Sequence, residues 1–119
     1  MSHAVRIFTV AILLLWCVAC SATLKPELPK SVSGVTRFLV SAPAAKSVSL
    51  VGSFNGWSPI AHRMVPVGSD GLWSVVVPLS EGEYAFMYLI DGTRWIAPPL
   101  AQDFVTDGFG NINGIVVIR

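Results

Sequence analysis

The chain has 119 residues, which is enough for one domain and too few for two. Eight Lys and Arg residues against seven Asp and Glu leave it nearly neutral, and without a basic run it lacks the electrostatic footprint of a nucleic-acid-binding protein. Its mean hydropathy of +0.65 is high, and much of the apolar excess lies at the N-terminus.

The first predicted element is a hydrophobic segment. Arg6 precedes the apolar residues 7–20, IFTVAILLLWCVAC, a run of 14 residues. A membrane-spanning helix needs roughly 20 apolar residues and the core of a signal peptide about 7 to 15, so the length favours an export signal. We therefore expect residues 1–20 to be a signal peptide or a membrane-anchor helix, and the remaining chain to be extracytoplasmic.

The end of this segment resembles the lipobox of bacterial lipoproteins. Its residues are CVAC, with Cys17 where leucine is usual. The resemblance implies that Cys20 becomes a lipidated first residue that holds the chain on a membrane. An uncleaved anchor helix, extended to about Leu24, and an ordinary secretion signal are the alternatives.

Residues 21–34, SATLKPELPKSVSG, contain two prolines and no hydrophobic periodicity, which predicts a linker. No cysteine occurs anywhere in residues 21–119. The folded part therefore has no disulfide and no cysteine metal site, and it must rely on its hydrophobic core.

From residue 35 onward the sequence predicts one all-β domain, an immunoglobulin-like sandwich over residues 35–119. Runs rich in β-branched and aromatic residues alternate with glycine-containing hairpin signals at intervals of about ten residues. Seven antiparallel strands are expected, over residues 36–41, 47–53, 63–67, 72–79, 83–90, 94–97 and 113–118.

Alternation within two of these strands predicts the core side. In residues 72–79 the expected core face consists of Trp73, Val75, Val77 and Leu79. In residues 83–90 it consists of Tyr84, Phe86, Tyr88 and Ile90. Met87 and Leu89 are then expected to face outward or into a groove.

The predicted domain offers few groups for catalysis. Its one histidine, His62, lies in a loop without a cysteine, and we interpret it as a solvated side chain. The pairs Asp103 with Asp107 and Glu81 with Glu83 are interpreted as turn and surface residues, not as a glycosidase carboxylate pair. We expect no enzymatic activity, no cofactor and no metal site.

The tryptophans are more informative. Trp57 follows the turn residues 54–56, and Trp95 follows a glycine-containing turn, so both indoles can be exposed. The apolar face of a pyranose packs on an indole, while its hydroxyls need amide partners, for which Asn111 and Asn113 are suitably placed. Spacing alone leaves open whether both rings simply cap the end of a sandwich.

Four segments taken in order resemble carbohydrate-binding module family 48. They are VSLVGSFNGWSP, DGLWSVVVPLSEGEYAFMYLIDG, RWIAPP and DGFGNINGIVVI. The family consists of early-set domains found in glycogen-branching and debranching enzymes and in the β subunit of AMP-activated protein kinase. The resemblance covers about residues 35–119, and it implies an early-set β-sandwich that binds carbohydrate.

The resemblance also implies a binding site. In members that bind α-1,4-glucans, the sugar platform uses two tryptophans, which fall here on Trp57 and Trp95. A hydrophobic residue and an asparagine of the last loop fall on Phe109 and Asn113.

This chain departs from the family pattern at two of these positions. Asn111 stands where a threonine is common. Met87 stands at the position of a sugar-contacting lysine, and a thioether cannot donate a hydrogen bond to a hydroxyl. The hairpin at residues 91–95 also holds one more residue than in the kinase subunits.

The leading hypothesis is a non-catalytic, membrane-tethered module that binds an α-1,4-glucan, glycogen-like or starch-like, or another glycan. The alternative is a structural or protein-interaction module of the cell envelope that has lost sugar binding. Met87, together with an apolar outer surface at Met87 and Leu89, favours this alternative. The expected partners are thus a polysaccharide or oligosaccharide, a membrane and an envelope protein, but no nucleic acid.

Overall fold

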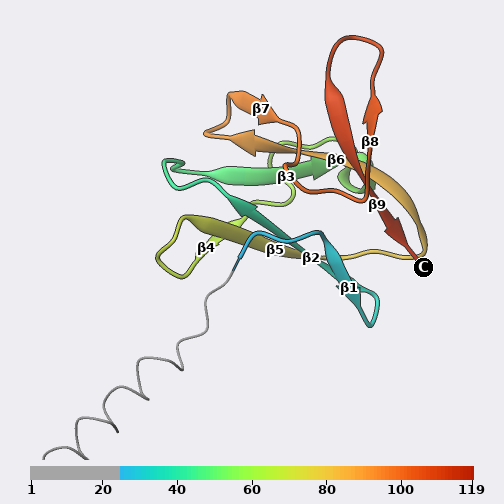
Figure 1. The fold of residues 1–119 in the computed structure, drawn as a ribbon, viewed down its shortest axis with the longest axis horizontal. Helices are drawn as coiled ribbons and strands as arrows, with labels where there is room; N and C mark the ends of the chain where they lie inside the picture. The colour runs from blue at the N-terminus through green and yellow to red at the C-terminus, as the bar shows by residue number, and fades with distance from the viewer. Residues whose placement is uncertain (1–24) are drawn as a thin grey trace, which may run out of the picture.

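The computed structural model describes residues 25–119, and its regular elements there are strands joined by turns and one short 3-10 turn (Figure 1). In chain order they are β1 (Lys30–Val32), β2 (Val35–Ser41), β3 (Val48–Gly52), the 3-10 turn η1 (Ser53–Asn55), β4 (Val65–Val67), β5 (Leu72–Pro78), β6 (Gly82–Ile90), β7 (Arg94–Ile96), β8 (Asp103–Thr106) and β9 (Ile112–Ile118). The predicted all-β class is confirmed.

The expected signal or anchor at residues 1–20 lies outside the described residues, as do Cys17 and Cys20. Within residues 25–119, no helix is long and apolar enough to cross a membrane.

The strands form two antiparallel sheets packed face to face as a sandwich (Figure 1). One sheet has the order β1-β2-β5-β4, and the other has the order β3-β6-β9-β8. On one side of β6, its first residues pair with β9 and its last residues pair with β7. On the other side it pairs with β3, so β6 has three partners. This long central strand positions most of the features described below.

The hydrophobic core fills the space between the sheets, and the predicted core faces of β5 and β6 are confirmed. From these two strands and their ends it contains Trp73, Val77, Leu79, Phe86, Tyr88 and Ile90, with Val75 and Tyr84 at its margin. The rings of Phe38 and Phe86 meet edge to face, with centroids 5.2 Å apart and planes at 71°. The indole nitrogen of Trp73 donates to the backbone oxygen of Ala42 at 3.1 Å, so its polar atom is satisfied inside the sandwich.

Ordered structure begins before Val35, where the sequence analysis placed the start of the domain. Strand β1, inside the expected linker, pairs with β2 in the register Lys30↔Arg37 to Val32↔Val35. Glu27 forms an ion pair with Arg37 and ties the preceding residues to the same strand. The sequence did not predict this strand because all three β1 residues are exposed. They therefore lack the alternation of apolar and polar residues by which a strand is identified.

Strand β8 was also missed, for the same reason. All four of its residues are exposed, yet they pair with β9 in the register Asp103↔Ile115 to Thr106↔Ile112. It is an edge strand, and its pairing depends on the neighbouring strand and not on its own pattern of burial.

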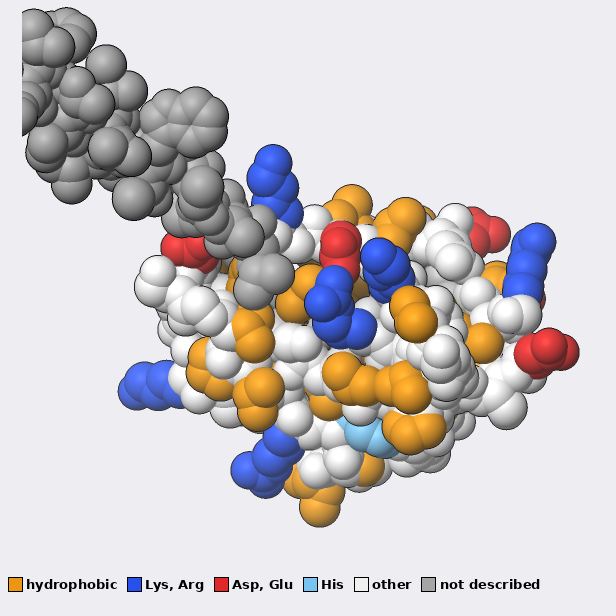
Figure 2. All heavy atoms as spheres, turned by 90° about the horizontal axis from the view of Figure 1, so that it is seen from below, with side chains coloured by type: hydrophobic (Ala, Val, Ile, Leu, Met, Phe, Trp, Pro, Cys, Tyr) orange, Lys and Arg blue, Asp and Glu red, His pale blue; other side chains and the backbone are white. Residues whose placement is uncertain are grey.

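The outer face of the β1-β2-β5-β4 sheet is partly apolar. Exposed valines at positions 32, 35 and 76 lie near Lys30 and Arg37 and line a shallow cavity of about 290 Å³. Figure 2 views the molecule from the side of this sheet and shows hydrophobic side chains between basic ones.

Met87 and Leu89 lie on the outer face of the other sheet but do not form the exposed apolar surface that was expected. They are only 9% and 4% exposed. Their neighbours across the sheet on the same face are Val51, paired with Met87, and Trp95, paired with Leu89. Both side chains line grooves, which is the second of the two placements expected for them.

Candidate functional site

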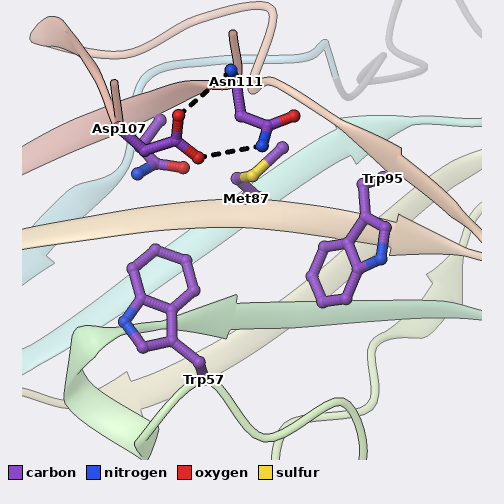
Figure 3. Close-up of a pocket in the computed structure, with 6 residues that line it drawn as sticks. Trp57, Met87, Trp95, Asp107 and Asn111 are labelled. Atoms are coloured by element: carbon purple, nitrogen blue, oxygen red, sulfur yellow. Dashed lines mark hydrogen bonds between the residues drawn. The ribbon is translucent and has the colours of Figure 1, made fainter. Parts of the chain in front are cut away.

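A pocket of about 460 Å³ lies on the outer face of the β3-β6-β9-β8 sheet (Figure 3). It is lined by Trp57, Met87, Trp95, Asp107, Asn111 and Asn113. The structure therefore brings together five of the six residues expected from the sequence. Their role in binding a ligand stays a prediction.

Trp57 follows η1, and the residues before it fix the shape of that turn. Gly52 ends β3 where a Cβ atom would come within 2.6 Å of the backbone oxygen of Ala85, so the position requires glycine. Phe54 packs at the edge of the core, 5.9 Å from Phe38 between ring centroids. The side chain of Asn55 accepts from the backbone nitrogen of Gly52 at 3.1 Å and closes the turn.

Trp57 itself has a left-handed backbone conformation, with φ of 60°. Its backbone nitrogen donates to the oxygen of Gly52 at 2.9 Å, which holds this unusual conformation in place. The side chain is left 40% exposed. The turn therefore presents the indole to the pocket and does not bury it in the core.

His62 is part of the same turn structure and is not simply solvated, as the sequence analysis had interpreted it. Its ring nitrogen Nδ1 lies 2.9 Å from Nδ2 of Asn55, and its ring meets Phe54 edge to face. The Nδ2 group of Asn55 also donates to the backbone oxygen of Leu50 at 3.1 Å. A structural role explains this histidine without any catalytic function.

Trp95 is positioned by the turn between β6 and β7. Asp91 has φ of 52° there, and its Oδ1 accepts from the backbone nitrogens of Lys46 at 2.7 Å and Ser47 at 3.0 Å. These hydrogen bonds lower the pKa of the Asp91 carboxyl below its usual value, and the one from Ser47 has the largest effect. Trp95 then pairs with Leu89 and is 49% exposed on the pocket side of the sheet.

The third side of the pocket comes from the loop between β8 and β9, which Asp107 organises. Its Oδ2 accepts from Nδ2 of Asn111 at 2.8 Å, and its Oδ1 accepts from the backbone nitrogens of Phe109 at 2.7 Å and Asn111 at 3.2 Å. The hydrogen bond from the Asn111 side chain is the main reason that the pKa of Asp107 is lowered.

Asp107 is the pocket residue that the sequence analysis missed, having been interpreted as a turn residue. That interpretation was correct but incomplete, because Asp107 also lines the pocket beside Asn111. An aspartate whose side chain accepts a hydrogen bond from the backbone nitrogen two residues later is a recognised turn signal. The spacing of four residues between Asp107 and Asn111 was the feature of the sequence that could have indicated their contact.

Phe109 does not join the others. It lies between two glycines with positive φ, Gly108 at 84° and Gly110 at 92°, and its side chain is 92% exposed. It is not among the residues that line the pocket, and its role in binding a glycan stays a prediction.

The pocket combines apolar surfaces with polar side chains. The two half-exposed indoles and the thioether of Met87 supply the apolar surfaces (Figure 3). The amides of Asn111 and Asn113 supply the polar groups. Within residues 25–119, no group of three histidine, cysteine or carboxylate side chains could hold a metal ion. The arrangement is suited to binding a ligand that is apolar on one face and rich in hydroxyls at its edge.

Comparison with known proteins identifies a family and several relatives. Residues 23–101 match the family model of carbohydrate-binding module 48, the isoamylase N-terminal domain. The chain is also similar to 1,4-alpha-glucan branching enzymes GlgB, with 42% identity over 57 residues in Bacillus cereus (strain AH187), 45% over 60 in Bacillus cytotoxicus and 39% over 79 in Leifsonia xyli subsp. xyli.

These alignments cover 48%, 50% and 61% of this chain but only 9%, 9% and 11% of the respective relatives. The chain thus spans about a tenth of the length of the curated relatives it matches. Because the family model matches well over half of the chain and the fold is the expected two-sheet sandwich, this chain belongs to carbohydrate-binding module family 48, a family of non-catalytic binding domains.

Proposed function

We propose that this chain binds an α-1,4-glucan in the pocket between Trp57 and Trp95 and catalyses no reaction. The observation that supports this most is that two half-exposed indoles line one pocket together with two asparagine amides. Membership of a carbohydrate-binding family supports a glycan as the ligand. The relatives are named as enzymes that act on 1,4-alpha-glucan, which favours that polymer.

The strength of binding follows from the chemistry of the pocket. Covering about 50 to 100 Å² of apolar surface on each indole contributes roughly 1–3 kcal/mol per ring. The loss of translational and rotational freedom offsets much of this, so a single oligosaccharide is expected to bind with a dissociation constant of about 0.1 to 10 mM. Many copies on one surface would retain a repeating polymer far better.

Met87 limits this affinity. It lines the pocket between the two indoles, at the position where a lysine contacts the sugar in related domains. Its thioether adds apolar contact but donates no hydrogen bond. The amides of Asn111 and Asn113 then have to provide most of the hydrogen bonds to the sugar hydroxyls.

The test is titration of the full chain with maltoheptaose in a sugar-free zwitterionic detergent, since maltoside detergents would compete for the site. Trp57→Ala is expected to weaken binding about tenfold or more, because it removes one stacking surface. Trp57→Phe should retain part of the affinity.

Val76→Ala, on the exposed face of the opposite sheet, is the matched control and should bind like the unchanged chain. Thermal unfolding of each variant checks that the fold is intact. No binding of the unchanged chain at 20 mM maltoheptaose, or equal binding by Trp57→Ala, would reject the proposal.

We further propose that the N-terminal segment holds the module at a membrane, on the extracytoplasmic side, through lipidation of Cys20. The hydrophobic run and the CVAC sequence support this proposal. Metabolic labelling with palmitate should mark the unchanged chain and leave Cys20→Ala unlabelled. Labelling of neither chain, with both still in the membrane fraction, would favour an uncleaved anchor, and release of both would favour secretion.

A protein partner in the cell envelope is the second candidate ligand. The exposed valines beside Lys30 and Arg37 on the β1-β2-β5-β4 sheet favour it, because they form an apolar patch away from the pocket. A partner bound there would be retained equally by the unchanged chain and by Trp57→Ala. Loss of the partner in Trp57→Ala would place its binding at the pocket instead.

A further inference from the structure

A second cavity, of about 380 Å³, lies next to the proposed glycan pocket, at the β3 edge of the same sheet. Buried apolar side chains form part of its wall, among them Met64 and Leu89. Two basic residues, Lys46 and Arg63, also line it, and both are exposed. The cavity thus combines an apolar surface with two positive charges.

Strand register places one side of this cavity on the face that carries the pocket, while the core residues Val48, Met64 and Trp73 form its other side. Arg63 bridges to Ser49, and paired residues of antiparallel strands project to the same side. Ser49 pairs with Leu89, which lies two residues beyond Met87 on the same face of β6. Leu89 lines the second cavity and Met87 lines the pocket, so the two sites share one face of β6 through residues about 6.6 Å apart along the strand.

Lys46 is held in a fixed position relative to Trp95. Its backbone nitrogen donates to Oδ1 of Asp91 at 2.7 Å, and Asp91 begins the turn that leads into β7. The loop containing Lys46 and the hairpin containing Trp95 therefore form one connected unit. The ammonium group can reach the cavity while its backbone stays anchored.

The second cavity carries positive charges from Lys46 and Arg63, whereas the pocket carries the negative charge of Asp107. Among residues 25–119 the ion pair is Arg37 with Glu27, on the opposite sheet, so neither Lys46 nor Arg63 is neutralised by a salt bridge within that part of the chain. The Asp91 carboxylate, which accepts two backbone hydrogen bonds, also interacts electrostatically with Lys46 and therefore offsets part of its positive charge. At the far end, Asp107 places a negative charge in the pocket.

We propose that the natural ligand is a glycan with an anionic substituent, a phosphate or a carboxylate, which binds between Lys46 and Arg63 while a neighbouring sugar stacks on Trp57 and Trp95. This inference rests on the proposed glycan site. The negative charge of Asp107 orients such a chain, because it repels the anionic substituent toward the basic cavity. Guanidinium and ammonium groups are the usual partners of phosphate and carboxylate oxygens.

The test compares three probes on the full chain in sugar-free detergent at low ionic strength: neutral maltoheptaose, maltoheptaose with one phosphate monoester, and maltoheptaose with one sugar oxidised to a carboxylate. We expect at least one anionic probe to bind about three- to tenfold more tightly than the neutral one, as two solvent-exposed charge contacts would give. The advantage should shrink in 0.5 M NaCl.

The double variant Lys46→Gln/Arg63→Gln should lose this advantage and bind neutral maltoheptaose like the unchanged chain. Lys30→Gln, which removes a charge from the opposite sheet, is the matched control and should keep the advantage. Equal affinity for all three probes, or an advantage that survives in the double variant, would overturn the inference and leave the glucan proposal intact. Failure of every probe to bind would reject the glucan proposal and this inference with it.

Discussion

The carboxylate of Asp107 shows how one residue can order a loop that contains two glycines with positive φ. It accepts from two backbone nitrogens and from the side chain of Asn111. This contact uses one of the two hydrogens of the Asn111 amide nitrogen, so the other hydrogen and the amide oxygen remain for hydrogen bonds with a sugar hydroxyl. Asp107 is therefore expected to act on the glycan partly through the orientation of Asn111.

This arrangement predicts how binding depends on pH. The pKa of Asp107 is lowered from its ordinary value of 3.8, so its charged form and the hydrogen bonds it accepts persist at and above that value and are lost as the pH falls through the lowered pKa. Maltoheptaose affinity should be constant from about pH 8 to 5 and decline only below about pH 4.

The variant Asp107→Asn should bind a few-fold more weakly at neutral pH and should lack this acid-dependent decline. Asp70→Asn, in a hairpin of the opposite sheet, is the control and should retain the unchanged profile. A decline that begins near pH 6, or one that persists in Asp107→Asn, would show that another group controls binding.

At the scale of elements, turns place the site and strands support it. Trp57 depends on the η1 turn, Trp95 on the turn after β6, and Asn111 on the loop before β9. All three turns contain residues with positive φ, which glycine and aspartate tolerate better than most residues. The strand β6, which pairs with β3, β7 and β9, keeps these turns at fixed distances from one another.

Strand β1 allows a prediction about where the folded unit begins. Removing residues 1–34 deletes β1 and the Glu27 contact and leaves the edge of β2 unpaired, whereas removing residues 1–24 keeps both. The shorter chain should be less stable by about 1–3 kcal/mol, because it loses the ladder hydrogen bonds along the three residue pairs of β1 and β2, at about 1 kcal/mol each. Urea unfolding of the two chains measures this, and equal midpoints would show that β1 adds nothing to stability.

At the scale of the whole molecule, the two sheets have separate outer faces. The pocket and the basic cavity lie on the β3-β6-β9-β8 face, while the N-terminal residues enter the other sheet at β1. If the chain is anchored through its N-terminus, the proposed glycan face is thus on the sheet that does not receive the anchor.

Much of the fold followed from local patterns. The alternation in β5 and β6 gave their core faces, because a strand buried on one side must place apolar residues at every second position. Strands β1 and β8 could not be predicted in this way, because their residues are exposed and only their partners define them. The role of His62 was equally hidden, since its contact with Asn55 depends on a turn that closes in three dimensions.

The sequence by itself determined the fold class, the family resemblance and the two indoles, because turn residues and aromatic spacing are local properties of the chain. The tertiary structure decided which side chains meet. It placed Trp57, Trp95 and the two asparagines around one pocket, added Asp107 to them, and left Phe109 outside. It also placed Arg63 and Lys46 around one cavity at the edge of the same sheet, because strand register and the Asp91 hydrogen bonds act between segments far apart in the chain.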